Sequence, residues 1–67
     1  MKVNELIKKL LNKDQQKEIS ITITFKGERH SLIMNVSSLI ENLEGVEQDQ
    51  DVVLIQPITN EEIILLF

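Results

Sequence analysis

ISITITF, residues 19–25, alternates strictly between large apolar side chains and hydroxyl-bearing ones. In an extended chain the three isoleucines and Phe25 lie on one face, while Ser20, Thr22 and Thr24 lie on the other. A period of two, with β-branched residues at most positions, is typical of a strand that buries one face. The stretch therefore predicts a half-buried strand, and the other elements can be placed around it.

The residues after this strand predict a hairpin. Gly27, within KGE (residues 26–28), can adopt the positive φ that short hairpin turns need. HSLIMNV, residues 30–36, then alternates again and predicts a second strand. One of its faces carries Leu32, Met34 and Val36, and the other carries Ser31, Ile33 and Asn35. Two strands joined in this way pair antiparallel.

The N-terminal segment VNELIKKLLNK, residues 3–13, has the periodicity of a helix. Its apolar residues share one helical stripe and are Val3, Leu6, Ile7, Leu10 and Leu11. Asn4 is the expected N-cap, because its side chain can accept a hydrogen bond from a backbone N–H of the first turn. We expect a helix over residues 4–13 that covers one face of a sheet.

The segment SSLIENLEG, residues 37–45, predicts a second, shorter helix. Ser38 and Glu41 have capping-box spacing, so that each side chain can satisfy a backbone N–H of the other residue. Gly45 is placed for a left-handed cap at the end of the helix.

The C-terminal segment predicts two further strands. VVLI, residues 52–55, is apolar on both faces, which favours a central strand. Pro57 cannot donate to a strand ladder, so it ends this strand or lies at its rim. Asn60 suits the following turn. Residues 62–67 predict a final strand that forms a hairpin with residues 52–55.

These elements predict a single α+β domain over residues 1–67, in the order α-β-β-α-β-β, with a four-stranded, largely antiparallel sheet and the N-terminal helix on one face. A chain this short buries only about 60% of the surface that its unfolded form exposes. It has no cysteine and a single histidine, so neither disulfides nor a zinc ligand set can supplement the core. Association with another chain is the remaining supplement.

The apolar residues outnumber those that one helix can cover. Unless the short second helix covers the rest, a partner protein must do so, either a second copy in a homodimer or a different protein. The candidate interface residues are Ile33, Val53, Ile55, Ile63, Leu65 and Phe67, although for the first five their sequence neighbours could take the same face instead. The alternative is that the C-terminal segment is a central strand buried within the monomer. We expect a small non-enzymatic protein-binding or inhibitory module whose interface includes the C-terminal strand.

Charge is distributed unevenly along the chain. Residues 1–30 hold all seven Lys and Arg and four acids, whereas residues 31–67 hold seven acids and no Lys or Arg, for a net charge of −4. The candidate acidic surface consists of Glu41, Glu44, Glu47, Asp49 and Asp51. An alternative function is therefore an acidic nucleic-acid mimic that blocks a DNA- or RNA-binding protein. Direct nucleic-acid binding is not predicted, because the lysines lack stacking aromatic residues.

The sequence predicts no catalytic, cofactor or metal site. His30 lacks a nucleophile and an orienting partner and is expected to be an exposed turn residue. Asp49 and Asp51 could begin a calcium loop, but the later ligand positions hold Val53, Leu54 and Asn60. The two glycines are too far apart for a phosphate-binding loop.

Two resemblances add to this picture. The opening MKVNELIKKLLNKDQQKEISI resembles small phage and prophage proteins of unassigned function that begin M-x-V-x-E-L-I-x-x-L, which implies a phage or bacterial setting and a non-enzymatic accessory role. ITITFKGERHSLIMNVSSLIENL is similar to the opening hairpin and helix entry of ubiquitin-like β-grasp domains, which provide an alternative fold. The chain shows neither a signal-peptide pattern nor a membrane-spanning apolar run, so we expect a cytoplasmic protein without membrane contact.

Overall fold

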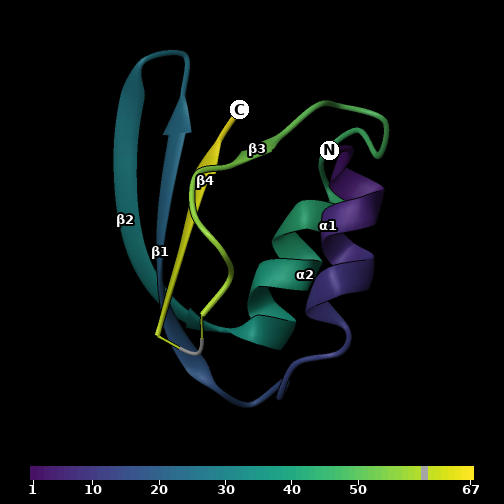
Figure 1. Cartoon of the computed structure of the whole chain (residues 1–67), viewed down its shortest axis with the longest axis vertical. Helices are drawn as coiled ribbons and strands as arrows, with labels where there is room; N and C mark the ends of the chain where they lie inside the picture. The colour runs from purple at the N-terminus through teal and green to yellow at the C-terminus, as the bar shows by residue number, and fades with distance from the viewer. Residues whose placement is uncertain (60) are drawn as a thin grey trace.

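The computed structural model describes residues 1–59 and 61–67 and shows a two-layer α+β domain (Figure 1). The elements in chain order are α1 (Val3–Leu10), β1 (Glu18–Phe25), β2 (Glu28–Asn35), α2 (Val36–Glu44), β3 (Val53–Leu54) and β4 (Glu62–Leu66). Both helices pack on the same side of one four-stranded sheet (Figure 1). The predicted fold class, element order and placement of the N-terminal helix are confirmed.

The sheet is mixed, with the strand order β2-β1-β4-β3. β1 pairs antiparallel with β2, and β3 pairs antiparallel with β4, so both expected hairpin pairings form. The two inner strands, β1 and β4, are parallel. Parallel neighbours need a long crossover connection, and here the chain passes from β1 to β4 through β2, α2 and β3. The order of the first hairpin and the helix after it agrees with the β-grasp alternative.

The β1–β2 turn is formed by Lys26 and Gly27, with φ values of 52° and 84°. Two consecutive residues with positive φ match the right-handed twist of a two-residue hairpin. The role predicted for Gly27 is confirmed.

Helix α1 is shorter than predicted and begins at Val3, with Lys2 rather than Asn4 as its N-cap. No side chain caps its first turn. Instead, the backbone N–H of Val3 donates to the carbonyl of Gln50 and that of Asn4 to the carbonyl of Gln48, both at 3.0 Å. The cap prediction was wrong because a distant loop satisfies the donors that a capping side chain would otherwise bind.

The end of α1 also differs from the prediction. Leu11 follows the helix and is 59% exposed, so it does not belong to the buried stripe. The side-chain amide of Gln15 donates to the carbonyls of Leu10 (3.0 Å) and Lys13 (2.9 Å). These hydrogen bonds satisfy carbonyls at and just after the C-terminal end of the helix, which have no partner within it.

Helix α2 begins at Val36, with Asn35 as its N-cap. The Asn35 side-chain oxygen accepts from the Ser38 backbone N–H at 2.9 Å and from the Ser37 hydroxyl at 3.0 Å. The predicted capping box of Ser38 and Glu41 is therefore wrong, since an earlier side chain takes that role. Gly45 has φ −81°, so the predicted left-handed cap is also wrong.

β3 corrects the prediction of a central strand over residues 52–55. It comprises only Val53 and Leu54 and lies at the sheet edge, while β4 takes the inner position. Val52 is buried because its backbone N–H pairs with the carbonyl of Met1 at 2.8 Å and its side chain joins the core. The apolar run at residues 52–55 therefore reflects burial of Val52 beside the N-terminal segment and not a central position in the sheet. The turn prediction for Asn60 lies outside the described residues.

The core lies between the sheet and the two helices. Its fully buried members with the largest side chains are Leu6, Leu10, Ile21, Leu39, Ile63 and Leu65. The segment ISITITF contributes Ile19 and Ile21 to this core, as its alternation predicts. Among the described residues no helix has the length and apolar character required to cross a membrane.

Candidate functional site

The side of the sheet that faces away from α1 and α2 carries no covering element in the described part of the chain (Figure 1). We call this side the open face. Side chains alternate along each strand, and directly paired residues share a face, so its members follow from Ser20, Thr22 and Thr24. The other open-face residues are Glu18 on β1, Arg29, Ser31 and Ile33 on β2, Glu62, Ile64 and Leu66 on β4, and Val53 with the following Ile55 at β3.

Three of the predicted interface residues lie on the open face. Ile33 is 75% exposed, and Val53 and Ile55 are each about half exposed. For Ile63 and Leu65 the assignment to this face was wrong, because both are fully buried against the helices. Their sequence neighbours, Ile64 and Leu66, take the open-face positions.

Phe67, the sixth predicted interface residue, is half-buried on the helix side of the sheet. Its ring meets that of Phe25 edge to face, with the centroids 6.3 Å apart. This arrangement is a favourable aromatic geometry. Phe67 therefore belongs to a different surface from Ile33, Val53 and Ile55.

Four apolar side chains of the open face form one cluster on β3 and β4. Val53 pairs directly with Leu66, and the backbone N–H of Ile55 donates to the carbonyl of Ile64 at 3.0 Å. Direct and diagonal cross-strand neighbours lie within side-chain contact distance. We call these four residues the β3–β4 cluster. Ile33 stands apart from it across the Ser and Thr side chains of β1.

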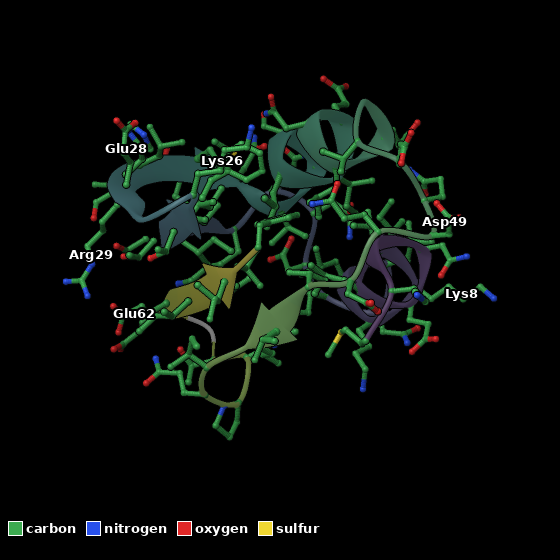
Figure 2. All side chains as sticks on the ribbon, turned by 90° about the horizontal axis from the view of Figure 1, so that it is seen from above. Lys8, Lys26, Glu28, Arg29, Asp49 and Glu62 are labelled. Carbon is green, nitrogen blue, oxygen red and sulfur yellow. The ribbon has the colours of Figure 1, made fainter. Side chains whose placement is uncertain are left out.

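The open face has one positive and one negative corner, and Glu18 adds a second acid at the end of β1 that lies nearer Glu62. Arg29 pairs with Thr24 near one end of β1, and Glu62 pairs with Ser20 near the other end, on the opposite side of that strand. Four residues along β1 and two strand spacings separate the charges, which is about 13 Å along the strands and about 10 Å across them. Both side chains extend from the side of the sheet that faces away from the helices (Figure 2).

The remaining two corners are apolar. Across one end of the sheet the register aligns Arg29, Thr24 and Leu66, and across the other end it aligns Ile33, Ser20 and Glu62. One diagonal of the open face is therefore charged, from Arg29 to Glu62, and the other is apolar, from Ile33 to Leu66 and the adjoining Val53.

A second surface feature lies on the helix side of the sheet, between α2 and the end of β1. It is an almost entirely apolar groove of about 320 Å³, which we call the α2 groove. Its lining residues are Ile23, Phe25, Leu39, Asn42, Leu43, Val46, Glu47, Gln50 and Phe67. The Lys26 ammonium lies 5.5 Å from the centroid of the Phe25 ring. The groove thus combines an aromatic wall with a polar rim.

The five candidate acidic residues, on α2 and the loop after it, are all exposed. Glu47 reaches the α2 groove. Asp51 instead pairs with Lys2, whose ammonium lies 3.0 Å from its carboxylate. This hydrogen bond and the charge of Lys2 lower the pKa of Asp51 below its ordinary value of 3.8, and Asp51 raises the pKa of Lys2 above 10.5. One acid of the surface is therefore already paired with a base from the N-terminal segment.

His30 lies on β2 and is exposed, with its Nε2 atom 3.7 Å from a carboxylate oxygen of Glu28. Among the described residues no three His, Cys, Asp or Glu side chains gather as a metal site would require. The prediction that His30 is a turn residue was wrong, because β2 already begins at Glu28, and the next residue, Ser31, lies on the opposite face of that strand.

Sequence reasoning allowed Ile64 and Leu66 only as the alternatives to Ile63 and Leu65, and it missed the α2 groove. EEIILLF (residues 61–67) contains no polar residue after position 62 that would show which of its alternate positions face the core. The groove depends on where α2 packs against β1, for which the sequence gives no signal. Comparison with protein-family models, with curated proteins and with solved structures finds no match for this chain.

Proposed function

We propose that this chain is a small, non-enzymatic protein-binding module whose open face, built largely by the C-terminal strand β4 and by β3, binds a second copy of the chain. The observation that carries this proposal is the β3–β4 cluster on a sheet face without a covering element among the described residues. Contiguous exposed apolar side chains of this kind usually mark interaction sites. A short chain with a thin core also gains stability from association.

The distribution of side chains favours a second copy as the partner. A dimer of two identical faces has a two-fold axis in the plane between them, and each surface must complement itself. An axis along the apolar diagonal exchanges the charged corners, so each Arg29 lies over the Glu62 of the partner copy. The same operation places Ile33 against Ile33 and Leu66 against Leu66, with Val53 close to the axis.

This geometry makes the strands of the two copies cross steeply, as in orthogonal sheet packing. It leaves the hydroxyl side chains of β1 at the centre of the interface. Within one copy the hydroxyl oxygens of Thr22 and Ser31 lie 3.4 Å apart there. Two opposite charges at each end of the interface then fix the relative orientation of the copies.

A charge swap tests the proposal. Sedimentation velocity should show a dimer for the natural chain at high concentration, and Arg29→Glu or Glu62→Arg should weaken it because each places like charges over one another. The double variant carrying both changes restores opposite charges and should restore dimerisation. Glu28→Arg is the control, since Glu28 is exposed next to Arg29 but lies on the other face of β2.

Two results would overturn the proposal. One is a monomeric natural chain up to about 1 mM, the concentration scale of very weak association. The other is a double variant that dimerises no better than the single variants, which would place the interface elsewhere. Circular dichroism of every variant verifies the fold, and all three exchanged positions are on the surface.

A further inference from the structure

The α2 groove lies on the helix side of the sheet and is therefore independent of the open face. Its volume of about 320 Å³ is at the lower end of the range of about 300–1,000 Å³ for ligand sites. That size suits one or two large side chains. The groove is not filled from within, since Phe25 at its wall remains 46% exposed.

The walls of the groove are held firmly. Leu39 and Leu43 on α2 are buried, at 1% and 3% exposure, and anchor that wall in the core. Phe25 and Phe67 form the opposite wall through their edge-to-face contact. A preformed apolar recess can accept an apolar group without the cost of ordering its walls first.

The charge around the groove indicates the chemistry of its occupant. Glu47 lines it directly, and α2 with the loop after it carries four more acids, Glu41, Glu44, Asp49 and Asp51, and no Lys or Arg. In the described part of the chain, Lys26 at the Phe25 ring is the one cation recorded against a groove residue. Lys2 forms its ion pair with Asp51, and the charge of Asp49 also interacts with it. An occupant with positive charge beside its apolar group is therefore complementary to the rim.

We infer that the α2 groove binds a basic peptide segment of a partner protein, with a large apolar or aromatic side chain in the groove and flanking Lys or Arg residues at Glu47 and the neighbouring acids. This site goes beyond the open-face interface and can be occupied at the same time. It also differs from imitation of nucleic-acid phosphates, because that function would leave the apolar groove unused.

A tryptophan-containing peptide provides a direct test. The chain has neither Trp nor Tyr, so the emission of the synthetic peptide KKLWKK reports on the peptide alone. In low salt the full chain should shift this emission to the blue and saturate, because the indole leaves water. The charge-inverted EELWEE should show no saturable shift. An equal concentration of KKSSKK, which keeps the charge and lacks the anchor, should not displace KKLWKK.

Matched variants locate the site. Glu47→Lys should weaken KKLWKK binding by about three- to tenfold, the range for rim charges. Glu61→Lys makes the same change in net charge at the opposite end of β4 and should leave binding unchanged. Phe25→Ser should weaken binding, whereas Ile33→Ser, on the open face, should not. Phe25 and Ile33 are both exposed enough for the variants to fold.

The results also separate this site from self-association. Ile33→Ser should weaken the dimer and spare peptide binding, and Phe25→Ser should do the reverse. The inference is overturned if KKLWKK gives no saturable shift up to about 1 mM. Displacement by KKSSKK, or an equal loss in Glu47→Lys and Glu61→Lys, would also overturn it, because either result indicates attraction by net charge alone.

Discussion

Asn35 shows how one side chain can set the boundary between two elements. It is the last residue of β2 and the N-cap of α2, and its side-chain oxygen accepts two hydrogen bonds. We expect Asn35→Ala to lower the free energy of unfolding by about 1 kcal/mol, the typical value of an N-cap, in urea denaturation. Asn12→Ala, at an exposed position after α1, should change it by less than about 0.5 kcal/mol. Equal losses in both variants would contradict the capping role.

The pair of Lys2 and Asp51 predicts a pH dependence of stability. The pKa of Asp51 is lowered by its hydrogen bond to Lys2, so the pair stabilises the fold above the ordinary value of 3.8. This contribution is lost as the pH falls through the lowered pKa. At the alkaline end it is lost as the pH rises through the raised pKa of Lys2, above 10.5. Both side chains are largely exposed, so the effect is small.

The matching experiment compares the natural chain with Asp51→Asn in thermal unfolding from about pH 2 to neutrality. The natural chain should be the more stable near neutrality, and the difference should disappear as Asp51 becomes protonated. Asp49→Asn is the comparison and should show a smaller pH-dependent difference, since Asp49 acts on Lys2 through its charge but no ion pair is recorded for it among the described residues. A difference between natural chain and Asp51→Asn that persists at the acid end would contradict the assignment.

At the scale of elements, the two glycines should respond oppositely to alanine. Gly27 has φ 84° in the β1–β2 turn, where a side chain is strained although the space around it is open. We expect Gly27→Ala to destabilise the chain by about 1 kcal/mol or more. Gly45 has φ −81°, and an added Cβ would approach the Asn42 carbonyl only to 3.4 Å.

Gly45→Ala is therefore the matched control and should be neutral or stabilising by up to about 1 kcal/mol, because alanine restricts the unfolded chain. Urea denaturation of both variants under the same conditions measures the contrast. A destabilisation in Gly45→Ala as large as that in Gly27→Ala would contradict the negative φ of Gly45, the residue that follows α2.

The sequence predicted elements best where side-chain periodicity alone determines them. ISITITF and the Gly27 turn are confirmed because strand alternation and positive φ are local properties. The ends of α1 and α2 and the edge position of β3 were wrong. Their determinants are distant, such as the carbonyls of Gln48 and Gln50 that satisfy the first turn of α1. A local sequence pattern cannot show a hydrogen-bond acceptor that is more than forty residues away in the chain.

The candidate sites follow from relations across the whole molecule. Ile33 and Leu66 become one diagonal, and Arg29 and Glu62 the other, only after β4 inserts parallel beside β1. An uncovered apolar face could be predicted from the sequence alone, because the apolar residues outnumber those that one helix can cover. The identity of its β4 members needed the register, which the uniform run of residues 63–67 does not encode.

Self-association through this face would couple stability to concentration. Because only folded chains dimerise, the thermal midpoint of unfolding rises as the protein concentration increases. A hundredfold increase contributes about 2.7 kcal/mol per dimer, half of it for each copy. For a chain of this size, and a dimer that is already formed at about 10 µM, that half corresponds to a rise on the order of 5–10 °C between about 10 µM and 1 mM.

Val53→Glu tests the same prediction by disrupting the dimer. Val53 is 52% exposed, so the variant should fold, yet two carboxylates would meet near the two-fold axis and oppose the dimer. Its thermal midpoint, measured by calorimetry, should not change with concentration. Leu11→Glu, which introduces the same charge at a residue 59% exposed beyond α1, is the control and should keep the concentration dependence. If the natural chain and Val53→Glu both had constant midpoints, the open face would not bind a second copy.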